Sequence, residues 1–171
     1  NVVTAYAAVS DQSAITVEWI LNGQSTDTST VPAPGGIASA DLTLAEGANT
    51  VLVRATDAFG RVGERSMTLY LDTTPPDVTI ASPAEGMAVR GVVDFDLVVN
   101  DPLPGSGAGL ATYRVDGQFL ATTPGPDRRV ALDTTSIPDG SHELGASAVD
   151  GLANVGSAAP RTIVVDNTAA E

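Results

Sequence analysis

The residues with the clearest chemical potential in this sequence are aspartates that stand in, or border, Pro- and Gly-rich segments. Asp72 and Asp77 flank the run Thr73-Thr74-Pro75-Pro76, while Asp101 and Asp150 each follow a strand-like stretch. Calcium takes six to eight oxygen ligands from carboxylates and backbone carbonyls, and it tolerates irregular geometry. These four aspartates are therefore candidate calcium ligands. The alternative is that they cap turns through hydrogen bonds to their own backbone, which Asp does routinely.

Few residues in this sequence could carry out catalysis. The sequence has no Cys, and all of its basic residues are Arg; disulfides, thiolate metal sites, Schiff bases and P-loop chemistry are thereby excluded. The only His, His142, stands beside Ser141 at the start of a strand-like stretch, where a structural role is expected rather than a catalytic triad. Gly105–Gly109 mimics a phosphate cradle, but no helix follows it, so we expect a flexible loop. The sequence predicts a protein that is not an enzyme.

The net charge limits the classes of partner that the chain is expected to bind. Twenty-one acidic residues against eight basic ones give a net charge of -13. A nucleic-acid partner is not expected, because binding phosphate requires a basic surface. No apolar run approaches the ~18 residues of a membrane span, so no direct membrane insertion is expected. An acidic surface fits an exported protein or one that collects divalent cations.

An internal repeat organises the chain. Residues 55–63 match residues 148–156 at an offset of 93, and Glu46-Gly47 matches Asp139-Gly140 at the same offset. The pairs Asn22-Gly23 with Asp116-Gly117, and Leu71–Thr74 with Val165–Thr168, follow at an offset of 94. The period is too long for a solenoid repeat and suits a sandwich domain of about 100 residues.

Between these landmarks, apolar residues alternate with period two, as in half-buried strands. Residues 15–21, 50–55, 93–99 and 143–149 are such stretches, and no window has a helical stripe. The sequence predicts an all-β fold of two tandem β-sandwiches joined by the Pro-rich linker Thr73–Asp77, with domains at 1–74 and 75–171. Proline fixes φ and removes an amide donor, so the linker is expected to be stiff.

The two predicted domains are not equally complete. Domain 2 has seven expected strands, at residues 78–81, 92–99, 111–115, 118–121, 129–132, 142–149 and 162–165. Domain 1 starts at the equivalent of the second of these strands and lacks a counterpart of Asp77–Pro83. Either the chain begins within a domain, as part of a protein that extends in both directions, or another segment supplies the strand.

The sandwich architecture brings the candidate ligands together. Its first strand starts at the end where the loop between the second and third strands and the loop between the sixth and seventh strands also lie. The linker aspartates Asp72 and Asp77 should therefore lie near Asp101 and Asp150. Asp11 and Asp57 hold the corresponding positions of domain 1 and would face a preceding joint, and Asp166 would serve a following one.

The joints resemble those of bacterial Ig-like domain arrays. The resemblance rests on Leu71–Ile80, Val115–Gly117, Leu132–His142, Ala148–Asn154 and Val165–Ala169. It covers nearly all of domain 2 and most of domain 1, which departs from the family pattern with Arg61 in place of Asn and with the bulky Phe59. The resemblance implies immunoglobulin-like sandwiches of a secreted or cell-surface protein, such as an adhesin.

Three functions follow as hypotheses. The first is a structural spacer and adhesion module, stiffened by calcium at its joint, whose partners are neighbouring modules and a cell-surface protein or glycan. The second is a carbohydrate- or protein-binding accessory module of a secreted enzyme. That hypothesis needs an exposed aromatic platform, whereas Trp19 is expected to be buried in the core, on the strand at residues 15–21. The third is a polymerising subunit that accepts a strand from another chain at the open edge of domain 1.

Overall fold

The computed structural model describes residues 1–125 and 127–168, so the last three residues of the second expected domain lie outside the described part. Within these ranges every regular element is a β-strand except one short 3₁₀ turn, η1 (Thr134–Ser136). No helix there is both long and apolar enough to cross a membrane. The chain divides into two compact units, unit 1 (Asn1–Asp72) and unit 2 (Thr73–Glu171).

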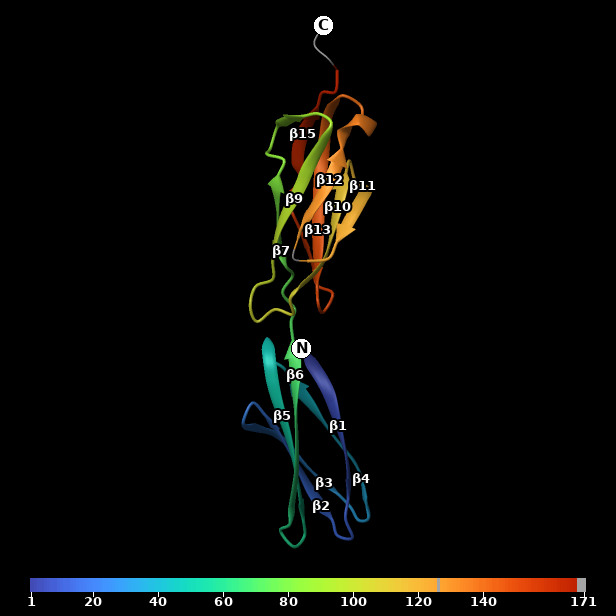
Figure 1. Cartoon of the computed structure of the whole chain (residues 1–171). Helices are drawn as coiled ribbons and strands as arrows, with labels where there is room; N and C mark the ends of the chain where they lie inside the picture. Colours follow the sequence, from blue (N-terminus) through green and yellow to red (C-terminus); the bar gives the residue numbers. More distant parts are fainter. Residues whose placement is uncertain (126, 169–171) are drawn as a thin grey trace. The chain divides into compact units, whose positions relative to one another are not determined.

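Unit 1 consists of six strands in two sheets (Figure 1). The strands are β1 (Val2–Ser10), β2 (Ile15–Leu21), β3 (Gln24–Val31), β4 (Gly35–Thr43), β5 (Gly47–Asp57) and β6 (Val62–Leu71). One sheet pairs β1 with β4, and the other has the order β3-β2-β5-β6. All of these pairs are antiparallel.

The core of unit 1 follows from the alternation along its strands. Ile15, Val17, Trp19 and Leu21 of β2 are all buried, and the residues between them are exposed or half-buried. Trp19 is 1% exposed, which confirms its expected place in the core. Burial of apolar surface contributes roughly 25 cal/mol per Å². With the buried side chains from β4 and β5, these residues are the main source of unit 1's stability.

Unit 2 has nine strands. They are β7 (Asp77–Ser82), β8 (Met87–Val89), β9 (Val92–Asn100), β10 (Ala108–Val115), β11 (Gln118–Thr123), β12 (Arg129–Asp133), β13 (Gly140–Asp150), β14 (Val155–Ser157) and β15 (Arg161–Val165). One sheet has the order β12-β9-β7. The other has the order β11-β10-β13-β15-β8, with β14 paired to β13. All seven predicted strands are confirmed, and the short strands β8 and β14 come in addition.

The core of unit 2 contains more aromatic side chains than that of unit 1. Phe95 of β9 and Tyr113 of β10 are fully buried and meet edge to face, with ring centroids 5.0 Å apart. Edge-to-face pairs add stability beyond their buried area. Leu132, Leu144 and Ile163 pack in the same cluster.

The repeated hairpin signal has the same geometry in both units. Asn22 and Gly23 have φ values of 51° and 81°, and Asp116 and Gly117 have φ values of 49° and 75°. Two successive left-handed residues make the tight turn that matches the twist of the flanking strands, and Asn-Gly and Asp-Gly suit it best. The predicted hairpins β2–β3 and β10–β11 are confirmed.

Candidate metal centre

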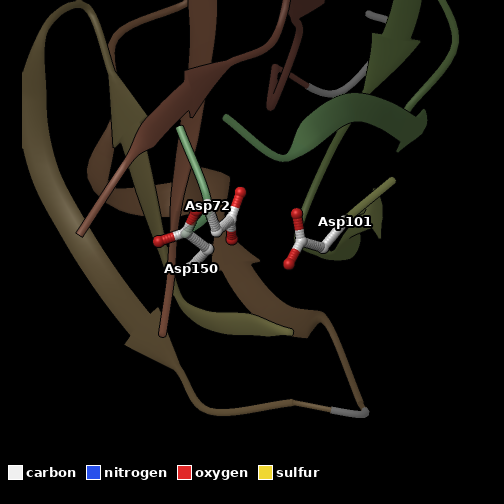
Figure 2. Close-up of side chains that lie close together, drawn as sticks. All are labelled: Asp72, Asp101 and Asp150. Carbon is white, nitrogen blue, oxygen red and sulfur yellow. The ribbon is translucent and has the colours of Figure 1, made fainter. Parts of the chain in front are cut away.

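Three of the four predicted ligands come together. One carboxylate oxygen from each of Asp72, Asp101 and Asp150 lies within 4.8 Å of the other two. Figure 2 shows the three side chains gathered, with Asp72 between Asp101 and Asp150 in this view. Asp72 and Asp150 are buried, and Asp101 is half-buried. Asp77 is not in this group and lies exposed at the start of β7.

Asp101 presents an oxygen with no partner. Its Oδ2 accepts a hydrogen bond from the Gly107 amide at 2.5 Å, which ties it across the loop between β9 and β10. Its Oδ1 is buried and has no hydrogen-bond partner among the described residues. A buried carboxylate oxygen without a donor is unfavourable, because burial removes the water that would otherwise solvate it. This oxygen is therefore available to a cation.

Asp150 caps the loop between β13 and β14, as the turn-capping interpretation expects. Its Oδ1 accepts hydrogen bonds from the amides of Leu152 and Asn154 at 2.8 and 2.9 Å. Its Oδ2 accepts a third bond from the Asn154 side-chain amide at 2.7 Å. Each carboxylate oxygen has two lone pairs, so these hydrogen bonds leave acceptor capacity on Asp150 with which it can bind a cation. The two interpretations of Asp150 are compatible.

Unit 1 has an arginine at the corresponding position. Asp57 corresponds to Asp150 and Arg61 corresponds to Asn154 at the repeat offset of 93. Arg61 Nε lies 2.5 Å from Asp57 Oδ2, and its guanidinium also lies 3.6 Å from Asp11, the counterpart of Asp101. Burial alone would raise the pKa of Asp57, but hydrogen bonds from Arg61 and Phe59 hold it below the usual value. Arg61 thus supplies a positive charge between the two aspartates of unit 1.

In unit 2, the counterparts of Asp11 and Asp57 have no arginine partner among the described residues. Among the described residues, Asp101 and Asp150 form no salt bridge, and the residue at the Arg61 position is the neutral Asn154. Like charges this close repel unless a cation bridges them or a proton neutralises one. The sequence showed Arg61 only as a departure from the family pattern. Its role as counter-ion depends on the fold that brings Asp11 to Asp57.

Asp166 lies apart from this group. Its amide donates to the Val89 carbonyl, and its carboxylate accepts a hydrogen bond from Thr168.

No family model and no curated protein sequence matches the chain. Among solved structures, part of a 1.5-MDa bacterial ice-binding adhesin is 18% identical with a TM-score of 0.52, covering 99% of this chain and 59% of that one. The fibronectin(III)-like modules of Clostridium thermocellum CbhA are 17% identical with a TM-score of 0.45, covering 96% and 85%. The BSP domain of a biofilm-associated protein is 14% identical with a TM-score of 0.36, covering 97% and 28%.

The sheet orders and the match to the adhesin segment together give the fold. The chain is two immunoglobulin-like sandwiches in tandem. The adhesin segment and this chain share this fold at 18% identity, and this chain spans 59% of the segment that it matches.

The immunoglobulin-like repeat also explains the single histidine. His142 Nδ1 contacts the Asp116 carboxylate at 2.7 Å, and Asp116 also accepts the Glu143 amide. At the same place in unit 1, the Asn22 side chain bonds to Asn49 and accepts the Thr50 amide. Both pairs fasten the β-hairpin turn to the following long strand. These contacts give His142 a structural role at the hairpin turn.

This pair makes the stability of unit 2 depend on pH. The hydrogen bond with Asp116 raises the pKa of His142 above 6.5, so its stabilising contribution is complete below that pH and is lost as pH rises through the folded value. We expect unit 2 to lose stability between about pH 6 and pH 8, by less than about 1 kcal/mol because Asp116 is half exposed.

Denaturation of the chain at pH 5.5 and pH 8.0, with NMR titration of the single imidazole, measures this effect. His142→Asn reproduces the Asn49 arrangement of unit 1 and should remove the pH dependence. A wild-type profile that stays flat, or a pKa of His142 at or below 6.5, would contradict the expectation.

Proposed function

We propose that this chain is a non-catalytic spacer and adhesion segment of a secreted or cell-surface bacterial protein, with a linker that calcium stiffens. The observation that carries the proposal is the carboxylate group Asp72, Asp101 and Asp150, at the linker that joins two copies of one fold. Neighbouring immunoglobulin-like modules would be its constant partners. A protein or glycan of another cell surface would be the target of adhesion.

The linker supports a spacer role. Only Thr73–Pro76 separate Asp72 from the first residue of β7, and two of these four residues are proline. Proline restricts φ and gives semi-rigid connections, whereas Gly- and Ser-rich linkers behave as flexible coils. A short, stiff linker between two repeated sandwiches suits a spacer.

The ligand set supports calcium over other cations. The group offers carboxylate oxygens, which calcium prefers, and it has no His or Cys that would favour zinc. The unpartnered oxygen of Asp101 and the guanidinium of Arg61 at the equivalent place in unit 1 both favour a cation here. Asp77 would join the set only through movement of the linker, since it lies outside the group.

Small-angle X-ray scattering of the full chain, in millimolar calcium and in excess chelator, tests the proposal. We expect calcium to narrow the distribution of interatomic distances, because the linker loses bending freedom when Asp72 and the two loop aspartates share one ion. Asp101→Asn should lose this response while keeping an acceptor for Gly107. Asp11→Asn, at the equivalent position of unit 1, is the matched control and should respond as wild type. Superimposable wild-type profiles in calcium and chelator would refute a calcium-stiffened linker.

A further inference from the structure

Unit 1 contains an open groove along one side of its sandwich. The groove has a volume of about 770 Å³ and is lined by residues of β1, β5 and β6, among them Ala7, Val9, Val53, Ala55 and Met67. About half of its lining residues are aliphatic, charged residues such as Asp57 and Arg65 line it as well, and Met67 is 56% exposed. Exposed apolar surface of this kind commonly marks a binding site.

The strands on either side of the groove have free edges. Among the described residues β1 pairs only with β4, and β6 pairs only with β5. Each therefore presents a row of unpaired backbone donors and acceptors. The nine residues of β1, Val2–Ser10, include no charge and no proline, so this edge lacks the features that normally prevent pairing with another strand.

Unit 2 has strands at both corresponding places. There β9, the counterpart of β1, pairs antiparallel with β7. The counterpart of β6 is β15, which pairs in parallel with β8. The segment from Asp77 to Val89, which we call the covering segment, thus closes the side of unit 2 that is open in unit 1.

Burial at equivalent positions reflects this difference. Along β13 the inward residues Leu144, Ala146 and Ala148 are all buried, whereas along β5 their counterparts become more exposed from Val51 to Val53 and Ala55. Likewise Ile163 of β15 is 0% exposed, and its counterpart Leu69 is only half-buried. The inward residues of unit 1 are apolar but lack the layer that would cover them.

A pair of equivalent glycines locates the missing backbone. A Cβ on Gly156 of β14 would overlap the carbonyl oxygen of Pro76, just before the covering segment. A Cβ on Gly63, its counterpart at the offset of 93, would meet nothing within 4 Å. Gly63 is thus a glycine at the position where a strand could approach closely, but the described part of unit 1 has no counterpart of the covering segment beside it.

We propose that the groove of unit 1 binds an extended segment patterned like the covering segment, antiparallel along β1 and then parallel along β6. In unit 2 only Arg90 and Gly91 separate β8 from β9. The occupant we commit to is therefore a segment of the same polypeptide that enters directly ahead of Asn1. Main-chain hydrogen bonds to both edges would hold it, and alternate apolar side chains would fill the groove.

The test is a fusion that places a copy of residues 76–90 directly ahead of Asn1 of the full chain. Trp19 is the only tryptophan and lies in unit 1, so its fluorescence reports the unfolding of that unit. We expect the fusion to raise the melting temperature of unit 1 on the order of 10 °C. Hydrogen exchange should slow at the amides of β1 and β6.

Two matched variants separate the groove from other effects. A fusion whose copy carries Ile80→Asp should give no rise, because Ile80 is an inward residue that is buried in unit 2. Gly63→Ala should leave the unfused chain unchanged and abolish most of the rise in the fusion. An equal rise in either variant would overturn the proposal.

Other occupants give different results. The peptide of residues 76–90 added separately should bind more weakly than the fused copy. Tight binding of the free peptide with no stabilisation in the fusion would overturn the source proposed here and indicate a strand from another chain. Concentration-dependent dimers of the unfused chain that protect β1 and β6 would indicate a second copy instead, and would also overturn it.

Discussion

Replacing Gly156 with alanine is expected to destabilise unit 2 by about 3 kcal/mol, the upper part of the range for overpacking. The new Cβ would overlap the Pro76 carbonyl oxygen, which is a backbone atom and cannot rotate away as a flexible side chain would. The glycine is itself fixed, because β14 pairs with β13. Relief requires β7 or β14 to shift, at the expense of their hydrogen bonds.

Gly63→Ala is the matched control for this prediction. Because a Cβ there meets nothing within 4 Å, the change should alter the stability of unit 1 by no more than about 0.5 kcal/mol. Calorimetry of the full chain, with Trp19 fluorescence as the reporter of unit 1, distinguishes the two units. A loss of at least about 10 °C should appear in the unit 2 transition of Gly156→Ala. Equal effects of the two substitutions would contradict the equivalence argued from the repeat.

The strands were predictable because their signal is local. Period-two alternation places Ile15, Val17 and Trp19 on one face wherever the partner strand lies, and Asn-Gly or Asp-Gly turns fix the hairpin that follows. The short strands β8 and β14 carry no such signal. Each has three residues, and each forms because a neighbouring strand offers a free edge. Their existence is a tertiary effect.

The candidate site was predictable in outline for a similar reason. Loops at one end of a sandwich must meet, so the sequence could associate Asp72 with Asp101 and Asp150. It could not distinguish Asp72 from Asp77 as a group member, because the two are separated by a few residues whose path the prolines determine. The contact of Arg61 with Asp11 was also beyond it, since these two residues lie 50 positions apart in the sequence.

Calcium is expected to stabilise unit 2, because an ion bound only by the folded state shifts the unfolding equilibrium. Extracellular modules bind calcium with dissociation constants of about 10⁻⁴ to 10⁻³ M. At 10 mM calcium this corresponds to about 1.4 to 2.7 kcal/mol. The unit 2 transition should therefore rise by roughly 5 to 20 °C over that in chelator. Calorimetry in the two buffers measures this shift.

The variants follow from the contrast between the two units. Asp101→Asn removes one charge but keeps the acceptor for the Gly107 amide, and it should lose most of the calcium shift. Asn154→Arg gives unit 2 the guanidinium that Arg61 gives unit 1, so it should stabilise the chelated protein and make calcium ineffective. Asp11→Asn should leave the calcium shift intact. If Asn154→Arg responds to calcium as wild type does, then Arg61 and a bound ion are not equivalent solutions to the same carboxylate repulsion.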